Sequence, residues 1–137
     1  MARNKKQPKN DRQPLHIKEL QNPKEAFRNI RNYLAGQFVG VTRDDFLLDE
    51  VLKCLFCKLV VETEGARSLD LQANSFELAK QIRNIFSSVR SDFPEIYPPD
   101  TEILLDPEAL HYVMRELDFS IMNANSDPIG DAFEVFV

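Results

Sequence analysis

Two cysteines three residues apart, Cys54 and Cys57, have the spacing that first suggests chemistry. A closed zinc site needs four ligands, and the sequence has no second cysteine pair or histidine cluster to complete one. Inside a helix this spacing places the thiols at neighbouring positions rather than in a redox turn. The pattern favours two thiols in or near the core over a zinc site or redox activity. Two cysteines cannot form a disulfide framework, which suits a protein of the reducing cytoplasm.

The remaining titratable residues do not form a catalytic constellation. His16 lies in a polar N-terminal segment, and His111 is expected on the outward face of a helix, where spacing supplies no nucleophile or partner. Asp49 and Glu50 are adjacent carboxylates, but neighbours on a helix point about 100° apart and do not converge on one substrate. We expect this pair to form a solvated edge, and we predict no catalytic and no metal site.

Lysine and arginine gather in three places that could contact nucleic-acid phosphates. They are Lys5, Lys6, Lys9 and Arg12 near the N-terminus, Lys24, Arg28 and Arg31 on one expected helix, and Lys80, Arg83 and Arg90 on another. The first group is interpreted as a solubilising tail in preference to a DNA contact. For the helical groups, a DNA-backbone contact and an ordinary polar helix face both remain open. The net charge of −5 argues against a protein that coats nucleic acid with its whole surface.

The positions of apolar residues predict an all-α fold, a bundle of four to five helices behind a disordered basic tail at residues 1–21. Helices are expected at 23–36, 42–63, 75–91, 107–117 and from 128 onward, with N-caps at Asn22, Thr42, Ser75, Asp106 and Asp127. The second is apolar around most of its circumference, which is typical of a central helix, and only Asp49, Glu50 and Lys53 form a polar strip. No signal peptide, membrane span or long alternating strand pattern is present, so we expect a soluble cytoplasmic protein with one domain at 22–137.

The final residues predict that the chain is incomplete. Ile129, Phe133 and Phe136 form an apolar stripe, and the sequence stops at Val137 without a helix-ending glycine or cation. We therefore expect this stripe to pack on a neighbouring domain.

The same segment resembles the signature D-x-x-G-x-x-(Y/F)-E-x-(F/L) of the modification (methyltransferase, M) subunit of type I restriction-modification systems, in the N-6 adenine DNA methylase family. Asp127, Gly130, Phe133 and Glu134 match it residue by residue. The very apolar helix that includes residues 49–59 is also similar to that family. The resemblance covers about residues 23–137 and implies the helical N-terminal domain of such a subunit.

The resemblance implies methyl transfer from S-adenosylmethionine to adenine N6 by the parent protein, but not by this stretch. That chemistry uses a Gly-rich loop and an Asn/Asp-Pro-Pro-Tyr/Phe motif around a flipped base. The glycines here stand alone at 36, 40, 65 and 130, and the Pro-Pro pair lies in Tyr97-Pro98-Pro99-Asp100. The implied role is to clamp double-stranded DNA and to assemble with the specificity subunit, the restriction subunit and the missing catalytic domain. The alternative is a free-standing helical protein-protein interaction module.

Overall fold

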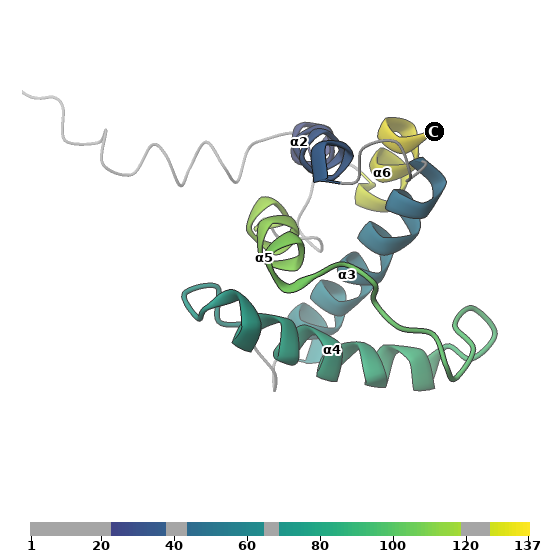
Figure 1. Ribbon diagram of the computed structural model, residues 1–137. Coiled ribbons are helices and arrows are strands. Elements are labelled where there is room, and N and C mark those ends of the chain that lie inside the picture. Colours follow the sequence, from purple (N-terminus) through teal and green to yellow (C-terminus); the bar gives the residue numbers. More distant parts are fainter. Residues whose placement is uncertain (1–22, 38–43, 65–68, 119–126) are drawn as a thin grey trace, which may run out of the picture.

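The computed structural model describes residues 23–37, 44–64, 69–118 and 127–137, and within them the fold is entirely helical (Figure 1). The helices are α2 (Pro23–Gln37), α3 (Asp44–Glu64), α4 (Ser75–Asp92), α5 (Pro107–Glu116) and α6 (Pro128–Phe136). The predicted all-α bundle is confirmed. The predicted tail at residues 1–21 and the caps at Asn22 and Thr42 lie outside the described residues.

The caps explain where three of the helices begin. Asn74 caps α4, because its Oδ1 accepts a hydrogen bond of 2.9 Å from the backbone N–H of Glu77. The prediction that Ser75 is the cap was wrong by one residue. Asp106 caps α5 as predicted, and its Oδ1 accepts from the Ala109 N–H at 2.8 Å. Asp127 occupies the N-cap position of α6, but its side chain makes no capping hydrogen bond.

Helix α3 is the central element, as its apolar circumference predicts. It contacts each of the other four described helices, whereas α2 packs on α5 and α6, and α4 packs on α5. Figure 1 shows α3 running diagonally from beside α6 to behind α4, with α2 and α6 next to each other at one end and α4 along the opposite side. Leu47, Val51, Cys54 and Leu55 of α3 are buried. Helices α2 and α4 do not contact each other.

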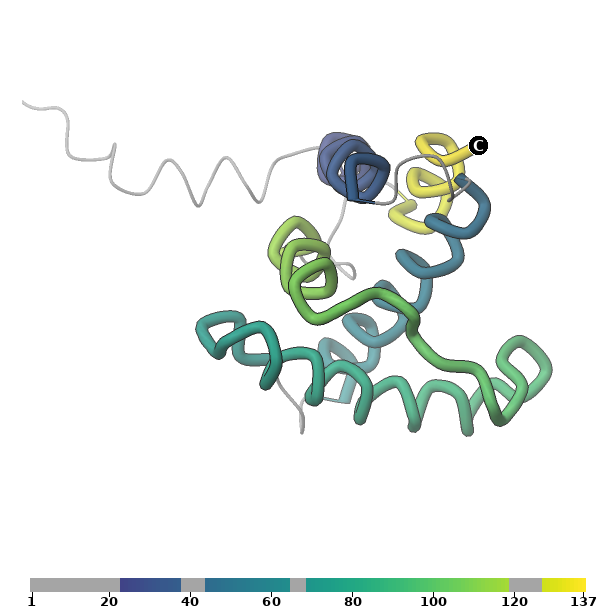
Figure 2. The backbone as a smooth tube through the Cα atoms, viewed as in Figure 1, coloured from purple at the N-terminus to yellow at the C-terminus, as the bar shows by residue number. Residues whose placement is uncertain are grey.

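The connection at residues 93–106 joins α4 to α5 and returns past α3 (Figure 2). Turns at its start satisfy part of its backbone, because the N–H groups of Ile96 and Tyr97 donate to the Phe93 carbonyl and that of Thr101 donates to the Pro98 carbonyl. The extended part that follows has no helix or strand to pair with, so side chains supply its hydrogen bonds. Glu50 Oε1 accepts from the N–H groups of Leu104 at 2.7 Å and Leu105 at 3.0 Å. Lys53 Nζ donates to the Glu102 carbonyl at 2.9 Å and pairs with Glu50 Oε2 at 2.8 Å. We call Glu50 and Lys53 the α3 clamp.

The α3 clamp corrects the prediction of a solvated edge. Glu50 is 0% exposed and Lys53 is 3% exposed, whereas Asp49 does reach solvent. Burial lowers the pKa of Lys53, but the hydrogen bond and the negative charge of Glu50, aided by Asp49, outweigh burial and raise the pKa above its ordinary value. Helical periodicity identifies this strip as polar, but it cannot reveal that an extended backbone covers the strip.

The clamp leads to a prediction on stability. Glu50→Ala leaves the Leu104 and Leu105 amides without their acceptor and removes the buried partner of the Lys53 ammonium group, so the free energy of unfolding should fall by about 3–5 kcal/mol. Asp49→Ala removes only a partly exposed pair, at 3.2 Å from Lys53, and should cost less than about 1 kcal/mol. Urea unfolding followed by circular dichroism measures both. Equal losses for the two variants would contradict this account of the clamp.

Candidate functional site

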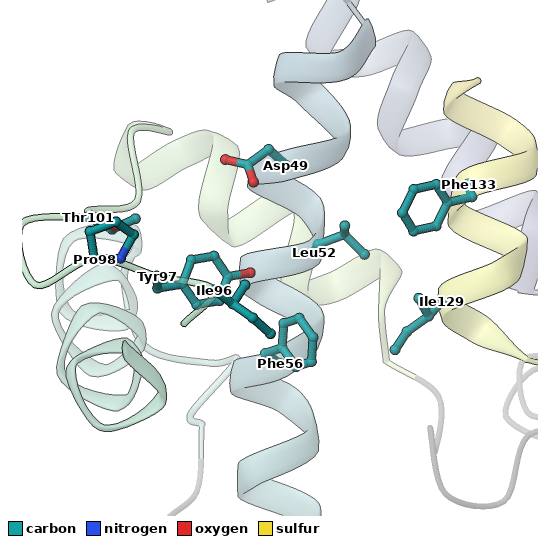
Figure 3. A pocket seen from close by; sticks show the side chains of 9 residues that line it. All are labelled: Asp49, Leu52, Phe56, Ile96, Tyr97, Pro98, Thr101, Ile129 and Phe133. Carbon is teal, nitrogen blue, oxygen red and sulfur yellow. The ribbon is translucent and has the colours of Figure 1, made fainter. Parts of the chain in front are cut away.

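A groove of about 480 Å³ opens between α3, the segment 93–101 and α6, and its surface is mostly apolar. Figure 3 shows α3 in the centre, with Tyr97, Pro98 and Thr101 on one side and Ile129 and Phe133 of α6 on the other. The lining residues are Asp49, Leu52, Phe56, Ile96, Tyr97, Pro98, Thr101, Ile129 and Phe133. Its size falls within the range of about 300–1,000 Å³ that is usual for binding pockets.

Helix α6 is buried on one side and open on the other. Ala132 and Phe136 are 0% and 2% exposed and belong to the core, where α6 packs on α2 and α3. Ile129 and Phe133 are 37% and 46% exposed and line the groove. The expectation that the stripe packs on a neighbouring domain is wrong for Phe136, which completes the bundle, and stays a prediction for Ile129 and Phe133.

Of the other three residues that match the family signature, Glu134 makes a contact with another helix. A Cβ atom added to Gly130 would lie 2.8 Å from Asp127 Oδ2, so glycine allows the Asp127 carboxyl group to lie close to the helix. Glu134 Oε1 pairs with Lys24 Nζ of α2 at 2.7 Å. This hydrogen bond is the main cause that raises the pKa of Lys24. The pair joins α6 to α2, in addition to the core packing of Ala132 and Phe136.

Three polar side chains, those of Asp49, Tyr97 and Thr101, interrupt the apolar lining of the groove. Tyr97 is 5% exposed, and its ring packs edge-on against Phe86 and Phe56 at centroid distances of 5.2 and 6.2 Å. Its hydroxyl group has no hydrogen bond to any described residue, although buried phenols usually find a partner. Burial, and next the charge of Asp49, raise the pKa of Tyr97. The Asp49 side chain is 57% exposed at the rim of the groove.

The predicted cationic residues are divided between two helices that do not touch, so the structure does not bring them together in one patch. On α2, Lys24 pairs with Glu134, and Arg31 pairs with Asp44 at 2.9 Å. Arg28 is exposed. The other predicted contacts, Lys5, Lys6, Lys9 and Arg12, lie outside the described residues.

The predicted cations of α4 have two different roles. The Arg83 guanidinium donates to the Leu105 carbonyl at 2.8 Å, and that of Arg90 donates to the Thr101 carbonyl at 2.7 Å. These bonds attach the extended segment to α4. Lys80 is exposed beside a shallow polar hollow of about 560 Å³ along the outer face of α4. That hollow is lined by Glu77, Lys80, Gln81, Arg83, Asn84 and Ser87.

His111 has partners that the sequence did not reveal. Its Nε2 lies 3.0 Å from the Leu71 carbonyl and its Nδ1 lies 2.8 Å from Ser75 Oγ. A carbonyl only accepts, so Nε2 carries the hydrogen and Nδ1 accepts from the serine hydroxyl in the neutral ring. The expectation of an outward, unpartnered histidine was wrong: His111 ties the start of α4 to α5.

The two cysteines are buried and reduced, as the core interpretation predicts. Burial raises the pKa of Cys57 to about 12 and that of Cys54 well above its ordinary value. Within the described ranges, no three His, Cys, Asp or Glu residues are grouped closely enough to hold a metal ion. The geometry therefore supports a structural role for both thiols.

Compared with known proteins, the chain matches no family model, no curated protein and no solved structure. Among the helices described, none is long and apolar enough to cross a lipid bilayer.

Thiol burial can be measured directly. Because the thiolate is the reactive form, Cys54 and Cys57 in the folded protein should react with Ellman's reagent at pH 8 at least about a hundredfold more slowly than in denaturant. Both thiols should be titrated once the chain is unfolded. Rapid labelling of either cysteine in the native protein would contradict the buried assignment.

Proposed function

We propose that this chain is the N-terminal helical domain of the modification subunit of a type I restriction-modification system. In this proposal it does not catalyse methyl transfer. It helps to assemble the adenine-N6 methyltransferase, by contacting the catalytic domain, the specificity subunit and the restriction subunit, and helps to close the complex around double-stranded DNA in the cytoplasm.

The arrangement of α6 is the observation that carries the proposal. Three of the signature residues make contacts within the chain: Asp127 lies close to Gly130, and Glu134 pairs with Lys24. The fourth, Phe133, remains 46% exposed in an apolar groove. A large aromatic side chain that the bundle does not bury is well suited to contact another domain or subunit.

S-adenosylmethionine is the cofactor of the proposed parent enzyme, and the residues of this chain do not fit it. A cofactor loop needs clustered glycines after a strand, but Gly36 and Gly130 lie inside helices, and the described part of the chain has no strand. The Tyr97 ring, beside the Pro-Pro pair, packs between Phe86 and Phe56 and is not free to stack on a base. We therefore assign cofactor binding and catalysis to the catalytic domain.

The outer face of α4 supports the DNA-clamping part of the proposal. Lys80, Asn84 and Ser87 line the same polar hollow there, and Lys, Asn and Ser side chains are frequent donors to DNA phosphates. On α2, Arg28 is exposed, and the exposed pair of Arg31 with Asp44 is weak enough for a phosphate to replace the carboxylate. These contacts would position DNA without reading its sequence.

A free-standing interaction module is the second candidate function. The exposed Ile129 and Phe133 favour it as much as they favour a domain contact, because either partner would cover the same groove. The two proposals differ in whether methylation of DNA depends on the chain.

Reconstituted methylation distinguishes them. We expect the chain to co-purify with the methyltransferase domain and the specificity subunit of the same operon, and to be required for transfer of tritiated methyl groups to adenine N6. Phe133→Ser should lower this activity about tenfold or more, since a half-buried aromatic anchor is lost. Phe76→Ser, at an exposed phenylalanine of α4 outside the groove, is the matched control. Equal methylation with and without the chain would reject the proposal.

Duplex binding by the chain alone tests the α4 surface. We expect weak, salt-sensitive binding, and Lys80→Ala should reduce the slope of log K against log salt by about one, because one phosphate contact is lost. Asn84→Ala should weaken binding without changing that slope, since it removes no charge. An unchanged slope in Lys80→Ala, measured by fluorescence anisotropy at several salt concentrations, would exclude this surface.

A further inference from the structure

We infer that the groove between α3, the segment 93–101 and α6 binds a peptide segment that presents a bulky apolar side chain flanked by lysine or arginine. The inference goes beyond the proposed function and does not depend on it, because it uses only the contacts and charges of this chain.

The apolar part of the groove sets the first requirement on the partner. Leu52 and Phe56 lie on α3, Ile96 comes from the extended segment, and Ile129 and Phe133 come from α6 (Figure 3). These walls leave about 480 Å³ open. Covering this lining requires a large aliphatic or aromatic side chain rather than a sugar or phosphate.

Tyr97 sets the second requirement. Its ring is fixed by Phe86 and Phe56, and in Figure 3 its hydroxyl points away from its own backbone towards Leu52 and the α6 side. Tyr97 is only 5% exposed. Its hydroxyl group nevertheless makes no hydrogen bond to the described part of the protein. A phenol so placed can donate to a carbonyl, and an extended or helix-terminal peptide backbone supplies carbonyls.

The surrounding charge sets the third requirement. Asp49 stands at the rim, and none of the residues that line the groove is basic. Exposed Glu95 and Asp100 are the chain neighbours of the lining residues Ile96 and Thr101. Two basic groups lie nearby, and both are occupied: Lys53 is 3% exposed in the α3 clamp, and Arg90 donates to the Thr101 carbonyl. This acidic rim attracts a cationic peptide and repels a nucleic acid or an anionic lipid.

The test uses two synthetic peptides of about 14 residues, long enough to form a helix on contact. One carries leucine on one helical face and lysine on the other, and its twin has glutamate in place of each lysine. Binding to the full chain is measured by fluorescence anisotropy, and the contact surface by nitrogen-15 NMR shifts. We expect the lysine peptide to bind at least about tenfold more tightly than its twin, with the largest shifts at Ile129, Phe133 and Tyr97.

Variants locate the contact. Phe133→Ser and Ile129→Ser should each weaken binding about tenfold, and Tyr97→Phe, which keeps the ring but removes the hydroxyl, about fivefold. Phe76→Ser should bind like the wild type, and circular dichroism checks that each variant is folded. The inference is overturned if both peptides bind equally or not at all, if the groove variants bind normally, or if the groove instead binds a second copy or a DNA duplex. Such results leave the methylation test of the proposed function unaffected.

Discussion

The fold depends on how the partly buried backbone of residues 101–105 is satisfied. A helix satisfies its own backbone, but this short extended stretch does not, and each unsatisfied buried amide costs about 1–3 kcal/mol. Glu50 accepts two amides of this segment, and Lys53, Arg83 and Arg90 donate to its carbonyls. These bonds fix the position of the segment relative to α3 and α4, and hence the position of Tyr97 and Ile96 at the groove.

Apolar packing supplies most of the stability, while this polar network selects the arrangement. Almost full burial is found for Phe27, Ile30 and Leu34 of α2 and for Phe136 of α6. Burial of apolar surface favours a compact fold, but it is non-directional and does not by itself select one arrangement. Hydrogen bonds from charged side chains are directional, so they specify where the segment runs. The outcome is a wall of the groove opposite α6, and α6 is itself held by the burial of Ala132 and Phe136, with an ion pair of Glu134 and Lys24 at its surface.

Local patterns in the sequence predicted the helices well, because cap residues and apolar spacing act over a few positions. The centrality of α3, the stop at Phe93-Pro94 and the start at Asp106-Pro107 all follow from such patterns. The sequence did not reveal hydrogen bonds between residues that are far apart in the chain. Glu50 bonds to Leu105, 55 residues on, and His111 bonds to Leu71, 40 residues back. No local spacing predicts contacts of this range, so charged residues that serve the interior were interpreted as surface.

The groove has walls from three segments that lie far apart in the sequence, at positions 49–56, 96–101 and 129–133. Such a surface is assembled only when the tertiary structure is complete, so a molecule that binds it has no comparable site on the unfolded chain. A ligand that binds only the folded chain stabilises it, by thermodynamic linkage. Once the free ligand concentration exceeds Kd, the gain in the free energy of unfolding grows with the logarithm of that concentration, and the melting temperature rises with it. Any molecule that binds the groove would therefore make the folded chain more resistant to unfolding and to proteolysis.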